Sequence, residues 1–146
     1  MAPAQVPPIV PDAPKYYDVH HIDEMYVRRR GEFLVGIHEG HLVAMGGIQQ
    51  TTPERAAVLR VRVHRDHQRR SFGRAIMQAL EARAAELGYT TLHLDTTVTR
   101  VPAQELYQSL GYREVGRLDD NPDWICILYE RRLAEGNHAR EDDDAR

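Results

Sequence analysis

The spacing of the apolar residues changes abruptly in the middle of the chain, from the period of a strand to the period of a helix. Between Ala57 and His64, apolar and charged residues alternate, which predicts a strand. Its two faces are expected to carry Leu59, Val61 and Val63 on one side and Arg60 and Arg62 on the other. From Phe72 to Leu87 the apolar residues recur at helical spacing, and Gly88 is a natural stop. A strand that leads through a polar turn into a long amphipathic helix restricts the chain to folds in which helices pack on a sheet.

The remaining segments add strands and helices around this unit. Alternation predicts a strand from Phe33 to Ile37, and Glu39-Gly40 can form the tight turn into the next strand. The expected elements are a short helix at 22–30, strands at 33–37, 41–50, 57–64 and 91–96, helices at 72–87 and 103–110, and closing strands at 112–117 and 124–129. After the first short helix the order is β-β-β-α-β-α-β-β, which predicts the α+β class with a mixed sheet and flanking helices.

The chain of 146 residues is long enough for one domain. Five of its eight prolines lie between Pro3 and Pro14, so residues 1–19 are expected to form an extended, proline-rich arm. Residues 134–146 are polar and include an acidic run, which predicts a solvated tail. The folded domain is therefore expected to span residues 20–133.

Composition restricts the partners of the protein. The formal net charge of −3 argues against a general nucleic-acid binder, and the lone Cys126 excludes an internal disulfide. No basic-then-apolar leader opens the chain, and no apolar run approaches the roughly 20 residues that span a bilayer. We expect a cytoplasmic protein that binds neither nucleic acid nor membrane; a homodimer is compatible with this composition.

The turn between the central strand and its helix is rich in groups that bind phosphate. The first amides of a helix lack internal partners and carry a partial positive charge, so this end of a helix attracts anions. Gly73 lets a ligand approach the backbone, and charge-assisted hydrogen bonds are available from Arg69, Arg70 and Arg74. The pyrophosphate and 3′-phosphate of a coenzyme suit this cluster. Without the helix, the same arginines would indicate a solvated face or, less readily, a nucleic-acid surface.

Other kinds of site fit the sequence less well. His64 and His67 are three residues apart, but no carboxylate or cysteine stands at a diagnostic spacing, so no metal is predicted. A P-loop would require Gly-Lys-Ser/Thr after the turn, and a Rossmann site would require three glycines. The turn has neither pattern.

The turn and a motif downstream of it resemble the GNAT superfamily of N-acetyltransferases. The family signature Q/R-x-x-G-x-G/A is matched from Gln68 to Gly73, with Ser71 in place of the first glycine. Ser71 is small enough to preserve an anion-binding turn if its φ stays negative. The family stretch A-x-x-L-Y-x-x-x-G-F/Y is matched by Ala103, Leu106, Tyr107, Gly111 and Tyr112. The resemblance covers about residues 33–133 and implies the family's acyl-CoA N-acyltransferase fold, with a mostly antiparallel sheet.

The resemblance also implies acetyl-coenzyme A as the cosubstrate. The backbone of Arg62 and Val63 would line its pantetheine arm. The pyrophosphate would be held by Gln68, Arg69, Arg70, Ser71, Phe72, Gly73 and Arg74. Tyr107 would stand near the thioester sulfur as the general acid for the departing thiolate. From its place on an apolar stripe alone, Tyr107 would be assigned to core packing.

Three departures from the family pattern concern the catalytic base, the coenzyme contacts and the front end of the fold. Ala57 stands where many relatives carry a catalytic glutamate, so the resemblance implies no base. His93 and Asp95, which share a strand face, and Glu54 are the alternatives. Arg100 replaces the usual asparagine. A proline-rich arm and a short helix stand in place of the family's first strand and long helix.

Together these features predict an N-acetyltransferase that moves acetyl from acetyl-coenzyme A to a primary amine of a small molecule or peptide. Direct attack in a ternary complex is expected, because no nucleophile and base are paired in the sequence. The alternative is a non-catalytic acyl-CoA-binding regulatory module of the same fold. The missing glutamate and the short front end favour that alternative.

Overall fold

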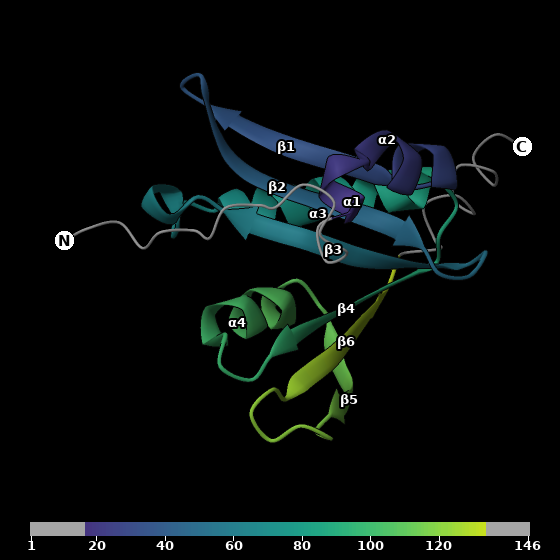
Figure 1. Cartoon of the computed structure of the whole chain (residues 1–146), viewed down its shortest axis with the longest axis vertical. Helices are drawn as coiled ribbons and strands as arrows, with labels where there is room; N and C mark the ends of the chain where they lie inside the picture. The colour runs from purple at the N-terminus through teal and green to yellow at the C-terminus, as the bar shows by residue number, and fades with distance from the viewer. Residues whose placement is uncertain (1–16, 134–146) are drawn as a thin grey trace, which may run out of the picture.

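The computed structural model of the chain describes residues 17–133 as a six-stranded sheet with helices on both faces (Figure 1). The predicted tail and residues 1–16 of the predicted arm lie outside the described residues. The elements are α1 (Tyr17–His20), α2 (Ile22–Met25), η2 (Val27–Arg29), β1 (Glu32–His38), β2 (His41–Gln50), β3 (Arg55–Val63), η3 (Arg65–His67), α3 (Phe72–Glu86), β4 (Thr91–Thr97), α4 (Val101–Ser109), β5 (Arg113–Leu118) and β6 (Cys126–Arg132). All six predicted strands and the two longer helices are confirmed, with ends displaced by a few residues.

The sheet is mixed and mostly antiparallel, as expected. Its strand order is β1-β2-β3-β4-β6-β5, and β3 with β4 is the parallel pair. That pair is short: Arg55, Ala56 and Ala57 pair with Thr91, Leu92 and His93, and beyond these residues the two strands diverge (Figure 1). The sheet is therefore joined near one end of β3 and split toward the other.

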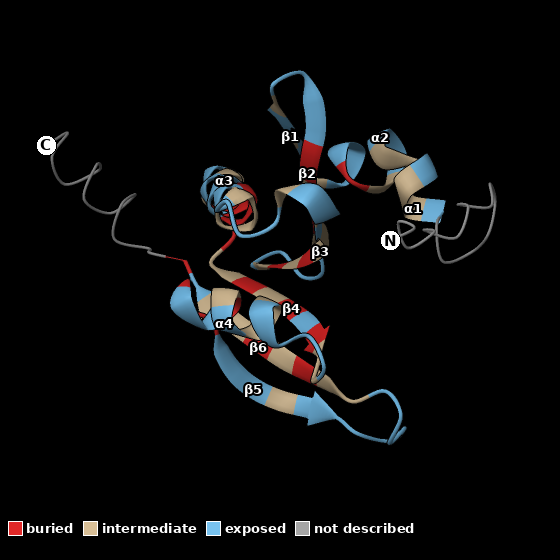
Figure 2. Ribbon diagram, turned by 90° about the vertical axis from the view of Figure 1, so that its left-hand side faces the viewer, coloured by how far each residue is buried: buried red, intermediate tan, exposed pale blue. Residues whose placement is uncertain are grey.

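Two adjacent glycines of β2 let side chains approach both faces of the sheet closely. A Cβ on Gly46 would lie 2.9 Å from Ile76 of α3, and a Cβ on Gly47 would lie 2.7 Å from Tyr26, which follows α2. Successive strand residues face opposite ways, so α3 covers one face and the α1–α2 segment covers the other (Figure 2). We call these the α3 face and the α1 face.

The core lies between α3 and the sheet and continues beneath α4. Of the predicted helical stripe, Ile76, Leu80 and Ala84 are buried, while Phe72 and Leu87 are partly buried against them. Removal of this apolar surface from water is the main stabilising contribution, at roughly 25 cal/mol per Å². Among the helices of residues 17–133, none has the length and apolar character needed to cross a membrane.

The predicted faces of β3 are wrong at one point, because the strand contains a bulge. Between Gly47 and Met45 of β2 the pairing advances two residues, while on β3 it advances three, from Leu59 to Arg62. The extra residue accompanies a φ of +59° at Arg60. Leu59 therefore shares the α1 face with its partner Gly47, whereas Val61 packs beside Gly46 on the α3 face.

The helix predicted over residues 22–30 is confirmed only at its start, over Ile22–Met25. The segment breaks into α2 and the 3-10 turn η2, since the backbone carbonyl of Tyr26 accepts from the amides of Arg29 and Gly31. Tyr26 is completely buried, and its ring lies edge-on to Phe33. Burial of this one aromatic side chain outweighs the continuation of a regular helix.

Candidate active site

The divergence of β3 and β4 opens a cavity of about 990 Å³ between the two halves of the sheet. Its walls are β3 from Val58 onward, the turn at 68–74, the second half of β4, and α4. Trp124 and Cys126 line the same space. A volume of this size accommodates a ligand as large as a coenzyme, and the polar groups of the turn lie at one end.

The structure brings together most of the residues predicted to bind the coenzyme. The lining of the cavity includes Arg62, Val63, Gln68, Arg69, Ser71, Phe72, Gly73 and Arg74. Arg70 is the predicted residue that does not line it. The Arg74 guanidinium donates a 2.6 Å hydrogen bond to the Ser109 hydroxyl, which joins the first turn of α3 to the end of α4.

The expectation of a negative φ at Ser71 is wrong. Ser71 and Arg69 both have φ of +65°, in the left-handed region that favours glycine. Ser71 is the N-cap of α3 and makes no side-chain capping bond. Left-handed residues at the head of a helix turn successive amides toward a common concavity, which is a recurrent anion-binding arrangement. The backbone thus keeps the conformation of a glycine although the residue is serine.

Gly73 has a packing role that the sequence prediction missed. A Cβ at this position would lie 3.2 Å from Leu106 of α4 and 3.5 Å from Val63 of β3. The missing side chain allows the first turn of α3 to pack closely against both neighbours. The amides at the helix start are therefore held near the open edge of β3.

Val63 presents its backbone to the cavity. The His64 amide donates to the Val43 carbonyl of β2 at 2.7 Å, and neighbouring residues of an antiparallel strand direct their backbone groups to opposite edges. The N–H and C=O of Val63 therefore face the split, where the carbonyl accepts from Gln68 Nε2 at 3.4 Å. The same alternation turns the backbone of Arg62 toward β2, so Arg62 contributes its side chain.

The side chains of Arg62 and Arg100 both line the cavity, and neither forms an ion pair with a residue in the range 17–133. Arg62 pairs with Met45 in the sheet and so lies on the α1 face. Its Nη1 donates to the Val61 carbonyl at 2.8 Å. Burial of the guanidinium, and then the positive charges of Arg100 and Arg60, lower the pKa of Arg62. This part of the cavity is thus suited to an anionic group.

Tyr107 combines a packed ring with an unbonded hydroxyl. The residue is 8% exposed, and its ring centroid lies 6.0 Å from that of Tyr112 and 6.2 Å from that of Tyr129. The hydroxyl makes no hydrogen bond within the described part of the chain, and Tyr107 lines the cavity. Burial raises the pKa of Tyr107, while the positive charges of Arg62 and Arg100 oppose the rise. The phenol is therefore protonated at neutral pH.

A smaller cavity of about 250 Å³ lies on the α1 face, where β3 and β4 still pair. Its lining includes two of the three candidate bases, His93 and Asp95. The third, Glu54, lines neither cavity; its backbone carbonyl accepts from the amides of Thr90 and Thr91. Val58, Leu59, Leu94 and Asp95 line both spaces, so the two cavities meet at the split.

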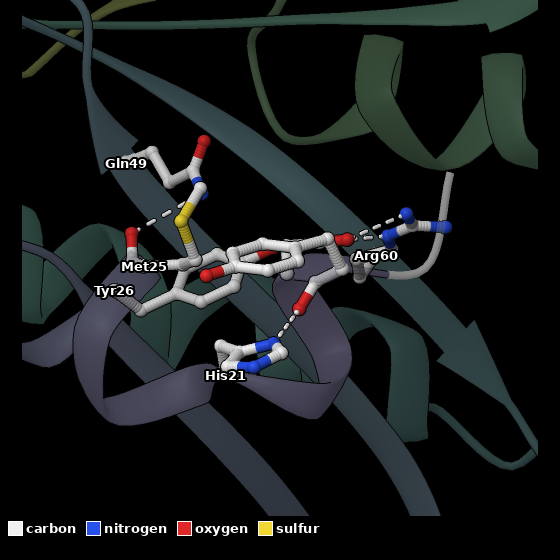
Figure 3. A network of polar contacts seen from close by, with 7 residues as sticks. His21, Met25, Tyr26, Gln49 and Arg60 are labelled. Carbon is white, nitrogen blue, oxygen red and sulfur yellow. Dashed lines mark hydrogen bonds and ion pairs between the residues drawn. The ribbon is translucent and has the colours of Figure 1, made fainter. Parts of the chain in front are cut away.

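A polar network that no sequence pattern indicated joins α1 to the bulge of β3 (Figure 3). The Asp18 carboxylate accepts from Arg60 Nε at 3.0 Å and Nη2 at 2.7 Å, and from the Tyr26 hydroxyl at 2.5 Å. Burial raises the pKa of Asp18, but the bonds from Arg60 and Tyr26 outweigh it and hold this pKa below its usual value. An aspartate at the end of a proline-rich arm gives no signal of this pairing, because the arginine is 42 residues away.

A mixed sheet split between two parallel strands, with an arginine-rich turn at the head of one helix and a tyrosine of a second helix lining the split, is the arrangement of an acyl-CoA N-acyltransferase fold. The chain belongs to the Acetyltransferase (GNAT) family, whose sequence model matches residues 4–112.

Sequence and structural similarity to individual proteins supports membership of this family. Over 114 residues the chain is 30% identical to the N-acetylaspartate synthetase of Danio rerio, an alignment that covers 75% of this chain and 39% of that protein. Among solved structures, a GNAT-family acetyltransferase from Staphylococcus aureus Mu50 superposes with a TM-score of 0.73 at 21% identity, covering 84% of this chain and 80% of the other. An aminoglycoside 6′-N-acetyltransferase complexed with coenzyme A gives a TM-score of 0.65 at 18% identity, covering 77% and 78%. At these identities the two structures show a common fold.

Proposed function

We propose that this protein transfers the acetyl group of acetyl-coenzyme A to a primary amine of a small molecule or peptide. The observation that carries the proposal is one continuous cavity that is lined both by the turn at 68–74 and by Tyr107. The similar aminoglycoside 6′-N-acetyltransferase is a complex with coenzyme A, which supports the choice of cosubstrate.

In this proposal each part of the cavity has one task. The turn holds the pyrophosphate through amides and guanidinium groups, and the Val63 backbone aligns the pantetheine arm. The neutral amine attacks the thioester carbon, a C–N bond forms, and a backbone amide of β3 stabilises the oxyanion. The C–S bond then breaks. The departing thiolate takes the Tyr107 proton, and the nitrogen gives its own proton to a base.

Surplus positive charge beside Tyr107 favours an acceptor that carries an anionic group near its amine. Arg62 and Arg100 face this part of the cavity without a carboxylate partner in the described chain. Asp95 lines the same space and suits the ammonium form of an incoming amine. An amino acid or the free end of a peptide combines both charges. The name of the similar N-acetylaspartate synthetase is consistent with such an acceptor.

The test is release of free thiol from acetyl-coenzyme A with a panel of amines, amino acids and peptides. We expect Tyr107→Phe to lower kcat by about 10²-fold or more, the usual contribution of a general acid, without a change in coenzyme affinity. Tight coenzyme binding with no turnover on any amine would instead establish the non-catalytic module.

The acceptor class is tested with matched pairs that differ only in the carboxylate, such as alanine and alaninamide. We expect kcat/KM to favour the carboxylate member by about tenfold or more, since a charge-assisted hydrogen bond contributes about 1.5–3 kcal/mol. Arg62→Gln is expected to remove most of that preference. Equal rates for both members of each pair in the wild-type protein would contradict the proposed acceptor class.

A further inference from the structure

The proposed transfer requires a group that accepts the proton of the attacking amine, and the position of the family's glutamate is occupied by Ala57. The parallel pairing of β3 with β4 places His93 directly opposite Ala57. Paired residues of a sheet share a face and lie about 5 Å apart. The imidazole therefore stands on the α1 face, one strand away from the vacant position.

His93 lies on the correct side of the split to meet an amine. It lines the smaller cavity on the α1 face, whereas the turn and α4 bound the larger one. The two cavities share Val58, Leu59, Leu94 and Asp95 as lining residues, at the point where the strands begin to separate. An acceptor that enters the smaller cavity would meet a thioester that reaches the split from the larger cavity.

The contacts of Thr51 explain how the imidazole is oriented. His93 Nε2 lies 2.8 Å from Thr51 Oγ1, and that hydroxyl lies 3.1 Å from the Arg55 carbonyl, which can only accept. With its single proton donated to that carbonyl, Oγ1 accepts from Nε2–H. Nδ1 then carries the lone pair, and it makes no hydrogen bond to a residue of the described chain. Protonation of Nδ1 leaves the Nε2–H bond to Thr51 unchanged, so the imidazolium is accommodated without rearrangement.

The charges around His93 keep the imidazole neutral near pH 7. Burial, and then the positive charge of Arg55, lower the pKa of His93 from its usual 6.5; the carboxylates of Glu130 and Asp95 oppose this. Arg55 of β3 forms an ion pair with Glu130 of β6, and this pairing weakens the effect of both charges on the pKa of His93. Arg113 of β5 is paired with Glu130 in the sheet. A neutral imidazole can accept a proton, whereas most free alkylamines at this pH are already protonated.

We propose that His93 is the general base of the acetyl transfer and that Thr51 is the residue that positions it. Nδ1 of His93 takes the proton of the amine as the C–N bond forms, and Nε2–H stays hydrogen-bonded to Thr51. The proton later passes to solvent, the thiolate is protonated separately by Tyr107, and the resulting phenolate regains a proton from solvent. This assignment rests on the proposed function.

The experiment compares pH profiles of kcat/KM for the whole chain, with an acceptor amine whose own pKa lies below the lowest pH of the scan, so that the amine is neutral throughout. His93 is active as the neutral base, so the wild-type kcat/KM is expected to fall as the pH is lowered. The midpoint of this fall should lie below 6.5, the usual pKa of histidine. His93→Gln should lower kcat by about 10²-fold and abolish that acidic limb. Thr51→Val should lower kcat by about tenfold and shift the limb, while Thr51→Ser, which keeps the hydroxyl, should behave like the wild type.

Calorimetry of acetyl-coenzyme A binding and circular dichroism on each variant separate a catalytic effect from lost folding or lost coenzyme affinity. Wild-type kcat and an unchanged acidic limb in folded His93→Gln would overturn the assignment while the proposed function stands. Absence of thiol release by the wild-type chain with every amine would remove both together.

Discussion

At the scale of single residues, the turn proposed to bind the pyrophosphate depends on backbone conformation more than on side-chain identity. Ser71 and Arg69 hold φ of +65°, where a Cβ costs about 1–2 kcal/mol. Strain of this kind persists where the surrounding structure fixes it, and here the close packing of Gly73 on Leu106 and Val63 fixes the start of α3. The sequence motif located the turn, because the turn is formed by residues that are adjacent in the chain. It could not reveal that serine adopts the glycine conformation.

Replacement of Ser71 by glycine is expected to stabilise the protein. The change removes the strained Cβ, and the larger conformational entropy of glycine in the unfolded chain offsets part of the gain. The net increase in the free energy of unfolding should be about 0.5–1 kcal/mol. Urea unfolding of the variant measures it, with Ser71→Ala as the control, since alanine keeps the Cβ and should give no gain. A Ser71→Gly protein less stable than the wild type would show that the positive φ is not a source of strain.

At the scale of elements, β3 is shaped by its bulge and by what holds the bulge in place. Arg60, which adopts the positive φ, is bonded on the α1 face to Asp18 of α1. The short front segment is thereby joined to the strand that borders the split. The alternation of apolar and charged residues predicted β3 itself. The same alternation does not reveal the extra residue of the bulge. The faces of Leu59 and Val61 were therefore separable only in the structure.

Asp18→Asn is expected to destabilise the fold by about 2 kcal/mol at pH 7, because charge-assisted bonds to a partly buried guanidinium are lost. The pKa of Asp18 is lowered in the folded state, so its stabilisation is full above the unfolded pKa of about 3.9 and is lost as the pH falls through the folded value. The difference in the free energy of unfolding between the wild type and Asp18→Asn should accordingly become smaller as the pH is lowered toward 3.

The matched control is Asp23→Asn. Asp23 pairs with Arg28 at 2.6 Å, but both side chains are largely exposed, so little stability should be lost. Equal losses for Asp18→Asn and Asp23→Asn in urea unfolding would mean that the front segment is not held by the Asp18–Arg60 pair.

Gly47→Ala tests how closely the α1–α2 segment packs on the sheet. The new Cβ would lie 2.7 Å from the Tyr26 ring and 2.8 Å from Phe33, inside any normal contact distance. Overpacking of this kind costs about 1–3 kcal/mol, which thermal unfolding would register as a lower Tm. At Gly36 the nearest atom to an added Cβ is 3.4 Å away, so Gly36→Ala is the milder control in the adjacent strand. An unchanged Tm in Gly47→Ala would mean that the Tyr26 ring can shift to make room for the new Cβ.

At the scale of the whole molecule, the order of strands and helices followed from periodicity because each element is a local property of the chain. The candidate site followed only in part. The turn at 68–74 and Tyr107 carry family motifs, whereas the cavity between them exists because β3 and β4 pair over three residues and then diverge. That geometry, like the contact of His93 with Thr51 across 42 positions of the sequence, is a long-range result of packing. Spacing along the chain does not encode it.

The central claim is that the split between β3 and β4 holds a coenzyme thioester by its phosphates. Isothermal titration of the full chain with acetyl-coenzyme A tests it most directly, with Arg69→Gln as a variant of the turn. We expect one coenzyme per chain and weaker binding at high salt, because the contact is ionic. Arg69→Gln should lose about tenfold in affinity, equivalent to about 1.4 kcal/mol. A folded chain that takes up no measurable acetyl-coenzyme A would contradict it.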